Sequence, residues 1–253
     1  MVRTIAAVQA RSSSRRLPRK ALLPLGGIPI VLRMARSLGL ASRVDGVVLA
    51  TSDDPSDDGL AALATAAGVP VSRGPVDDIV ARMWTAATSQ KADVLVRLWG
   101  DSPLIVPELI DRAVATLIEV DAGYLTTGLP NDDPFPIGVG LEVYSMATLE
   151  RLRDAAADPF YREFPFEWVA AKTSGVRIHR LSAPRDDSDI ALTVDYESDY
   201  ERVAAVFDAL HVEGKPLGYD ELIAYCRLHP EVGQSAPDLA RNPDYFEKKA
   251  QRT

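Results

Sequence analysis

A short apolar run followed by a basic loop is the most informative part of this sequence: "TIAAVQA" (4–10) leads directly into "RSSSRRLPRK" (11–20). Five of the twelve residues at positions 9–20 are positively charged, although the formal net charge of the chain is -8. Residues 1–44 hold nine Arg or Lys and no Asp or Glu, so the rest carries 19 basic and all 36 acidic residues. This concentration of charge favours an anion-binding pocket, and the alternative is a solvated basic surface.

Composition limits the class of protein. A chain of 253 residues with 47% apolar and 25% charged residues can bury a full core as one large domain. No apolar stretch reaches the roughly 18 residues of a membrane span, so we expect a cytoplasmic protein with no membrane partner. The pI of about 5.0 argues against a general nucleic-acid binder. The single Cys226 excludes an internal disulfide, and three scattered histidines do not indicate a zinc site.

Hydrophobic periodicity alternates between strand and helix along the first hundred residues. Short runs rich in Val, Ile and Leu predict buried strands at 4–10, 45–52, 69–74 and 92–101, and apolar spacing of three and four predicts helices at 28–38, 57–67 and 76–90. This alternation implies right-handed crossovers and a mainly parallel sheet with helices on both faces. Ligands of such sheets bind beyond the carboxyl ends of the strands, which is where the loop 11–20 begins.

The chemistry of this loop suits a triphosphate. Its three serines offer hydroxyls and accessible backbone N–H groups, its guanidiniums offer planar donors for phosphate oxygens, and Pro18 restricts the chain before Lys20. Neither G-x-x-x-x-G-K-[ST] nor G-x-G-x-x-G follows the first strand, so the loop is not a P-loop or a dinucleotide-binding turn. A different nucleotide-binding design is expected.

The segment "VQARSSSRRLPRKALLPLGGIPIVLRM" (8–34) resembles the opening of the cytidylyltransferases that make CMP-activated acidic sugars. It is most similar to the spore coat polysaccharide biosynthesis protein F group, which opens with Q-A-R-x-x-S-x-R-L-P-x-K. The resemblance continues in the expected order through 47–83, 96–111, 192–203 and 228–249. It implies one domain over 1–253 with an α/β, GT-A-like nucleotidyltransferase fold: a Rossmann-like three-layer α/β/α arrangement with a mixed, mainly parallel sheet.

The same resemblance implies the reaction and its partners. CTP and Mg²⁺ would bind, the hydroxyl of a small acidic acceptor would attack the α-phosphate, and pyrophosphate would leave. In related synthetases a projecting arm, here at about 128–145, helps to form a homodimer and contacts the acceptor. The C-terminal part, from about 197 to 253, is expected to be helical. Whether Glu142, Arg97 and Arg162 contact the acceptor stays open, and Glu142 could also be an exposed strand-end acid.

The resemblance also assigns residues to CTP. Arg16 and Lys20 match the R-L-P-x-K positions and would neutralise the departing pyrophosphate as catalytic residues. The base and ribose would meet the first part of the motif, so the expected nucleotide-binding residues there are Gln9, Ala10, Arg11, Ser12 and Ser13. Arg15 and Arg19 fall on variable positions and are expected to be solvated.

Two carboxylates are the candidates for holding Mg²⁺. Asp101 ends a strand and follows Gly100, so a sharp turn would present it at the same sheet edge as the basic loop. Asp195 ends another apolar run before an acidic helix start. In the resembled family these two positions supply the metal carboxylates. The alternative for Asp101 is a turn or helix-cap aspartate.

Other polar residues near the predicted edge are weaker candidates. The acidic clusters at 52–59 and 76–80 lie where helices begin, which favours capping over metal binding. Ser52 and Asp53 nevertheless close a strand and are kept as residues near the base. Arg73 and Arg97 are candidate contacts to phosphate or acceptor, and Arg97 could instead pair with a neighbouring carboxylate.

Three positions depart from the family pattern around the acceptor. Ile137 and Gly140 replace two aspartates of P-D-G-x-D-x-E-V, and Phe164 stands where a histidine is expected. An apolar lining gives hydroxyls no partner, so the acceptor is expected to be smaller or less hydroxylated than a nine-carbon sugar acid, with Arg73, Arg97 or Arg162 binding its anionic group. Two alternatives remain: a GT-A glycosyltransferase that uses a nucleotide sugar, and a catalytically silent nucleotide-binding protein.

Overall fold

The computed structural model describes residues 2–128, 134–234 and 243–252. Its main feature is a seven-stranded sheet with the order β5-β4-β1-β6-β8-β7-β9. Only β8 runs antiparallel to its neighbours β6 and β7, while the other pairings are parallel. The strands are β1 (Thr4–Gln9), β4 (Gly46–Ser52), β5 (Val71–Gly74), β6 (Val94–Trp99), β7 (Tyr124–Thr126), β8 (Glu142–Ser145) and β9 (Ile178–Arg180). The mixed, mainly parallel α/β sheet predicted from the sequence is confirmed.

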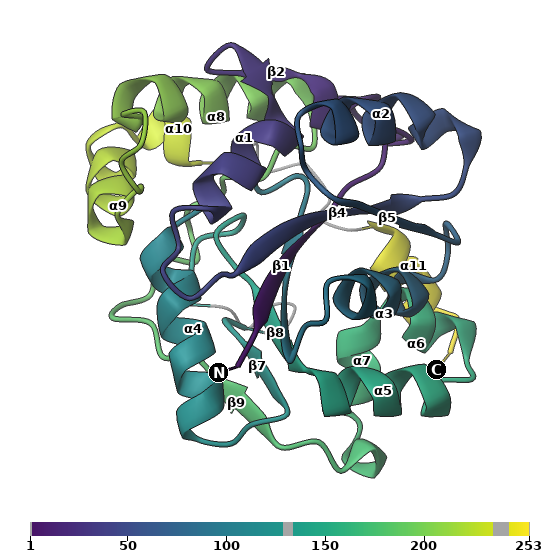
Figure 1. The fold of residues 1–253 in the computed structure, drawn as a ribbon. Coiled ribbons are helices and arrows are strands. Elements are labelled where there is room, and N and C mark those ends of the chain that lie inside the picture. Colours follow the sequence, from purple (N-terminus) through teal and green to yellow (C-terminus); the bar gives the residue numbers. More distant parts are fainter. Residues whose placement is uncertain (1, 129–133, 235–242, 253) are drawn as a thin grey trace.

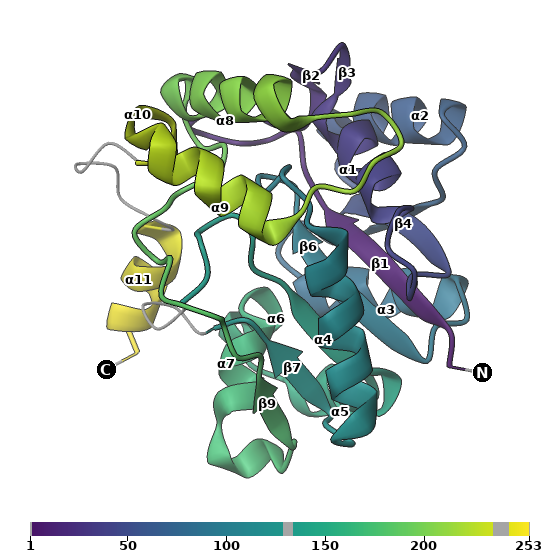
Figure 2. The ribbon, with the colours of Figure 1, turned by 90° about the vertical axis from the view of Figure 1, so that its left-hand side faces the viewer.

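Helices cover both faces of the sheet (Figures 1 and 2). On one face lie α1 (Ile30–Leu38), α2 (Asp58–Ala66), α4 (Pro107–Glu119), α8 (Glu197–Leu210) and α9 (Tyr219–Leu228). On the other lie α3 (Ile79–Ser89), α5 (Met146–Ala155) and α7 (Pro165–Ala170). The alternation of side chains along β1 explains the two cores, because Ala6 and Val8 join the first and Ile5 and Ala7 join the second.

The shorter elements complete the chain. They are η1 (Lys20–Leu22), β2 (Pro24–Leu25), β3 (Ile28–Pro29), η2 (Pro55–Asp57), α6 (Pro159–Glu163), η3 (Lys172–Ser174), α10 (Pro230–Gly233) and α11 (Pro243–Ala250). The helix α11 packs back on the α6 region, where Tyr245 lies against Phe160 and Phe164. Among the described residues, no helix combines the length and apolarity needed to cross a bilayer.

The described part of the expected arm, residues 134–145, does not project. Phe135 and Leu141 are buried in the main core, and β8 is an interior strand of the sheet. The apolar residues of this stretch therefore contribute to the body of the protein and not to an exposed loop. Residues 129–133 of the same expected arm lie outside the described residues.

A close contact at the carboxyl edge of the sheet positions the first two loops. The N–H of Gly100 donates to the carbonyl of Gln9 over 2.9 Å. A Cβ at position 100 would lie 2.6 Å from the Cβ of Ala10, nearer than atoms can approach without displacement. Gly100 therefore lets the loop after β6, which carries Asp101, lie directly beside the loop after β1.

Candidate active site

The basic loop after β1 is tied to the end of β4 by one buried carboxylate. Asp57 accepts a 2.6 Å hydrogen bond from the N–H of Ser12, and it also accepts from the N–H and hydroxyl of Ser52. Its side chain is completely shielded from solvent. At the other end of the loop the N–H of Arg19 donates to the carbonyl of Ser12 over 3.0 Å, with Arg19 at a left-handed φ of 61°. The loop is thereby closed on itself.

These hydrogen bonds change the acidity of Asp57. Burial alone would raise the pKa of this carboxyl, but donors from Ser52 and Ser12 stabilise the charged form and hold the pKa below its usual value. Asp57 is thus an ionised group that fixes the start of the loop to the sheet edge.

Lys20 joins the two candidate metal carboxylates. Its Nζ donates to Asp195 over 2.8 Å, to Asp101 over 3.3 Å and to the carbonyl of Val194 over 2.7 Å. Burial opposes the charged form of Lys20, but the two carboxylates outweigh burial and raise its pKa. The sequence placed Lys20 and Asp101 at one sheet edge and the family resemblance added Asp195, and the structure brings the three side chains into contact.

Arg16 completes this group from the same loop. Its Nη2 lies 2.7 Å from an oxygen of Asp195, and its guanidinium stacks over the ring of Tyr196 at 5.3 Å from the centroid. Both basic residues matched to the family motif therefore face the same carboxylate. Arg11, Ser13 and Arg19 are instead exposed.

Backbone pairing sets the position of Asp195. The N–H of Leu192 donates to the carbonyl of Ile137 over 2.7 Å, and the N–H of Val194 donates to the carbonyl of Asp101 over 2.8 Å. One chain segment thus runs alongside the loop that carries the first carboxylate. Asp195 follows as the next residue, which explains why carboxylates so distant in sequence meet.

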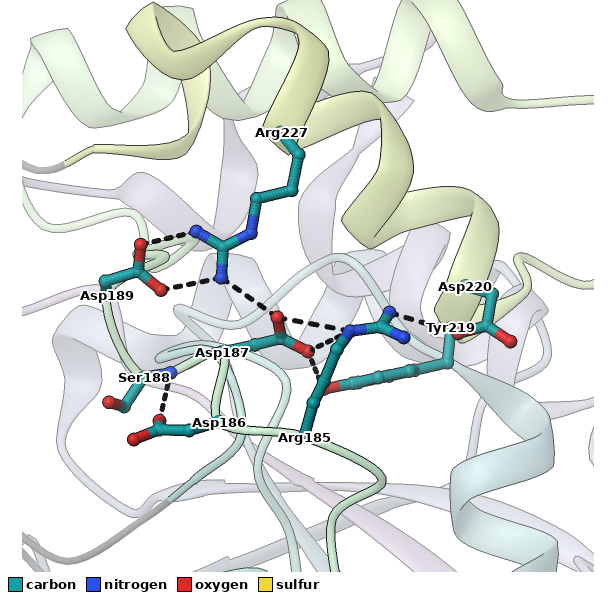
Figure 3. Close-up of polar contacts among 8 residues, drawn as sticks. All are labelled: Arg185, Asp186, Asp187, Ser188, Asp189, Tyr219, Asp220 and Arg227. Atoms are coloured by element: carbon teal, nitrogen blue, oxygen red, sulfur yellow. Dashed lines mark hydrogen bonds and ion pairs between the residues drawn. The ribbon is translucent and has the colours of Figure 1, made fainter.

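The start of this segment is anchored to the C-terminal helices through Asp187 (Figure 3). The fully buried carboxylate accepts from Arg227 over 2.9 Å, from Arg185 over 3.3 Å and from the hydroxyl of Tyr219 over 3.0 Å. Its own N–H donates to the carbonyl of Pro134. The two arginines compensate the buried charge, so this cluster anchors the segment on α9 without contacting the reacting groups.

The pair Asp101 and Asp195 fits a divalent cation by its chemistry. Both carboxylates contact the Nζ of Lys20, so they face one cationic position at this edge. Mg²⁺ is typically held by one or two carboxylates and completes its shell with water and phosphate oxygens. No cluster of three or more acidic, His or Cys ligands occurs in the part of the chain that the structure describes. Asp101 and Asp195 are thus the candidate pair for such an ion at this edge.

A second polar cluster lies on the α3 side of the same edge. Arg97 donates to Glu142 over 2.7 Å and to the side-chain oxygen of Gln9 over 2.8 Å. Glu142 also accepts from the hydroxyls of Tyr124 and Tyr144, each over 2.9 Å. Burial together with the charge of Glu142 raises the pKa of both tyrosines, so they remain neutral donors. Glu142 is buried, which corrects the alternative of an exposed strand-end acid.

Two of the arginines predicted to contact substrate instead bind groups of the chain itself. Arg73 donates to the carbonyls of Ser52 and Asp54 and pairs with Asp58 at 2.7 Å. Arg162 pairs with Asp78 at 2.6 Å. Ser52 is buried against Asp57, and Asp53 is exposed at the end of β4.

The expected caps are confirmed in the two acidic clusters. Asp54 accepts from the N–H of Ser56 and Asp78 accepts from the N–H of Ala81. Asp57 is the exception, because its side chain turns away from its own helix toward Ser12. This role was not predicted from the sequence. The segment 52–59 contains more aspartates than a helix start needs for capping, and this excess is the signal that could have indicated it.

The family of this chain is evident from its relatives. The family model described as "Cytidylyltransferase" matches residues 5–167. The spore coat polysaccharide biosynthesis protein SpsF of Bacillus subtilis is 30% identical over 89% of this chain and 94% of its own length. Since the match spans both the basic loop and Asp101, it covers much of the site described above.

Solved structures agree with this assignment. The structure of a cytidylyltransferase from Leptospira borgpetersenii has a TM-score of 0.85 at 28% identity and covers 95% of this chain and 100% of its own. The structure of CMP:2-keto-3-deoxy-manno-octonic acid synthetase complexed with CTP has a TM-score of 0.64 at 19% identity, covering 82% and 99%, and so shares the fold. From its sequence, its fold and the grouping of its basic loop with Asp101 and Asp195, this chain belongs to the cytidylyltransferase family.

Proposed function

We propose that this cytidylyltransferase uses CTP to attach CMP to a small organic acid, with release of pyrophosphate. The observation that carries the proposal is the contact of Lys20 and Arg16 with the paired carboxylates Asp101 and Asp195. Phosphoryl transfer requires charge neutralisation and positioning above all, and this cluster offers both cations and hard anionic ligands.

The basic loop would bind the triphosphate. Arg16 and Lys20 would donate to oxygens of the β- and γ-phosphates, where negative charge grows as pyrophosphate departs. Gln9, Ala10, Arg11, Ser12 and Ser13 would line the base and ribose, with Ser52 and Asp53 beside them. The Asp57 link to Ser12 supports this assignment, because it fixes the loop before any ligand arrives.

The carboxylates Asp101 and Asp195 would hold Mg²⁺. A bound Mg²⁺ would neutralise phosphate charge in the transition state. The oxygen of the acceptor hydroxyl forms a bond to the α-phosphorus, the bond from that phosphorus to the bridging oxygen of the β-phosphate breaks, and the hydroxyl proton is released. The products are the CMP ester of the acceptor and pyrophosphate.

The acceptor proposed is an acid with fewer hydroxyls than a nine-carbon sugar acid. Several relatives carry the name 3-deoxy-manno-octulosonate cytidylyltransferase, which points to acidic sugars as a class. Ile137 and Gly140 offer no polar side chain beside the segment that leads to Asp195. Phe164 supports this argument less, because its ring packs against Phe160 and Tyr245.

One experiment tests the activity. The protein is incubated with each nucleoside triphosphate, Mg²⁺ and a panel of acidic sugars, and pyrophosphate is measured. Acceptor-dependent pyrophosphate from CTP alone is the expected result. Release of nucleoside diphosphate from a nucleotide sugar would indicate a glycosyltransferase instead, and nucleotide binding without turnover on any acceptor would indicate a silent binding protein.

We infer further that the protein works as a homodimer in the cytoplasm. Sedimentation should give a mass twice that of the 27.4 kDa chain. A monomer under turnover conditions would contradict the dimer.

A further inference from the structure

Arg82, in the second turn of α3, is a buried arginine with unused donors. The residue is 1% exposed, and its Nη2 donates to the carbonyl of Val76 over 3.2 Å. Its Nε and Nη1, which carry three N–H groups, have no partner among the described residues. Buried polar groups are normally hydrogen-bonded, so donors of this kind indicate an unmet requirement for an acceptor.

Comparison with Arg33 shows that this is not a general property of buried arginines in the protein. Arg33 lies in α1 and is 3% exposed. Its Nε donates to Leu25, its Nη2 to Gly26 and its Nη1 to Glu213. An arginine that serves the fold alone is thus fully partnered here, whereas Arg82 is not.

The charges around Arg82 leave an excess of positive charge. Burial lowers the pKa of Arg82 to about 10, with further lowering by Arg11 and Arg97, while Asp57 and Asp78 act in the opposite sense. Both carboxylates are committed elsewhere: Asp57 to Ser12 and Ser52, and Asp78 to Arg162 and its helix start. The nearby acids therefore form no hydrogen bond with Arg82.

Arg82 lies at the ligand edge of the sheet. A Cβ at Gly74 would come within 3.0 Å of the Cγ of Arg82, and Gly74 is paired in register with Ser52 at the end of β4. Two residues earlier on the same face of β5, the buried hydroxyl of Ser72 also lacks a partner among the described residues. This places the unused donors on the α3 side of the edge, opposite the α8 side that supplies Asp195.

We propose that Arg82 binds the anionic group of the acceptor, a carboxylate or a similar planar oxyanion. This inference rests on the proposed function. The proposed phosphate ligands Arg16 and Lys20 lie on the α8 side, whereas Arg82 lies on the α3 side. Arg82 is covered in this structure, so the anion reaches its guanidinium when neighbouring side chains such as the exposed Arg11 move. Arg82 would then set specificity for acids over neutral sugars.

The test uses the variants Arg82→Met and Arg33→Met, with sodium pyruvate and 2-keto-3-deoxy-manno-octonate as probes and sodium chloride at equal ionic strength as the control. Thermal unfolding is followed with and without CTP. In the wild type each probe at saturation should raise the Tm by at least about 2 °C. Arg82→Met should lose the rise in Tm caused by the probes but keep the rise caused by CTP. Without ligand, Arg82→Met should melt no lower than the wild type, because an unpartnered buried charge has been removed. Arg33→Met should melt lower.

Kinetics give a second readout. With any acceptor that supports turnover, Arg82→Met should lower kcat/KM for the acceptor about tenfold or more while the KM for CTP stays unchanged. Arg82→Lys keeps the charge but has a different donor geometry, so its kcat/KM for the acceptor should lie between those of the wild type and Arg82→Met. This variant also tests the proposal if Arg82→Met does not fold.

Several results would overturn the proposal: no probe-dependent rise in the wild type, destabilisation of Arg82→Met equal to that of Arg33→Met, or loss of CTP binding with Arg82→Met. The last result would make Arg82 part of the nucleotide site. A protein that binds the probes through Arg82 but releases no pyrophosphate would contradict the proposed function and leave the anion site standing.

Discussion

The guanidinium of Arg97 and the carboxylate of Glu142 form a 2.7 Å ion pair in which neither side chain is more than 5% exposed. This pair links β6 to β8 and continues to the side chain of Gln9 at the end of β1. The oxygen of the Gln9 amide accepts from Arg97, so this side chain is held in one orientation. A buried pair in the sheet thus orients one polar group at the site.

Replacing Glu142 with Gln should be strongly destabilising, because it leaves Arg97 buried without its counter-charge. Breaking such a pair costs about 3–5 kcal/mol, whereas replacing both partners with apolar residues is often neutral. Urea unfolding of Glu142→Gln and of the double variant Arg97→Met with Glu142→Met measures this difference. If Glu142→Gln is as stable as the double variant, leaving Arg97 without its counter-charge does not cost the expected free energy of unfolding.

Asp101→Asn and Asp195→Asn should each keep the fold and lower kcat by about two to three orders of magnitude, since size is kept and a charged ligand is lost. Pyrophosphate release at varied Mg²⁺ measures the effect, and circular dichroism checks the fold. Asp45→Asn, far from the site at the amino end of β4, is the matched control. Full turnover by either site variant would remove that residue from the proposed metal site.

Lys20→Ala and Arg16→Ala should weaken the use of CTP about tenfold or more, because a charged hydrogen bond to phosphate is worth about 1.5–3 kcal/mol. Arg19→Ala should change kcat/KM for CTP little, since Arg19 is exposed. Steady-state kinetics with varied CTP compares the three variants. Equal losses in all three would mean that the loop acts as a diffuse basic patch.

The stability that Asp57 provides should depend on pH. Burial opposes its charge, yet hydrogen bonds from Ser52 and Ser12 hold its pKa below the usual value. A carboxyl with a lowered folded pKa stabilises the protein above its unfolded pKa of about 3.9 and loses that contribution as the pH falls through the folded pKa. We expect the wild type to exceed Asp57→Asn by about 1–3 kcal/mol near pH 7.

Below about pH 4 this difference should shrink, as the wild-type carboxyl takes up its proton. Denaturant unfolding at several pH values measures it. Asp58→Asn, which changes an exposed carboxylate one residue later, should show a smaller difference at every pH. A wild-type advantage that stays constant down to pH 3 would contradict the assignment.

The sheet could be predicted from the sequence because buried parallel strands are short apolar runs. Such a run can be identified from its own residues, without knowing which strands lie beside it. The run 4–10 contains β1, and 92–101 contains β6, and both are bounded by polar residues. Asp101 and Lys20 could be placed at one edge for the same reason, since each follows such a strand. Asp195 required the family resemblance, because it follows a segment that belongs to no strand of the sheet.

Side-chain pairing inside the site was harder to predict. Arg73 and Arg97 were candidate contacts to substrate. Arg73 is instead held by groups at the β4 end, and for Arg97 the alternative, a neighbouring carboxylate, is the one found, in Glu142 of β8. Which group pairs with each arginine depends on strand register and loop packing, and the local sequence pattern gives no information on either. Arg82 was missed because one charged residue in an amphipathic helix is normally solvated, and only its burial sets it apart.

The position of Asp195 means that the boundary of the family match cuts through the candidate site. The match to the family model ends at residue 167, yet Asp195 comes 28 residues later and bonds directly to Lys20 in the first loop. A gene fragment that stops at the boundary would encode the basic loop and Asp101 but would lack one of the two proposed metal carboxylates. Surveys that classify related chains by the matched region alone would therefore not distinguish chains that keep this second carboxylate from chains that lack it.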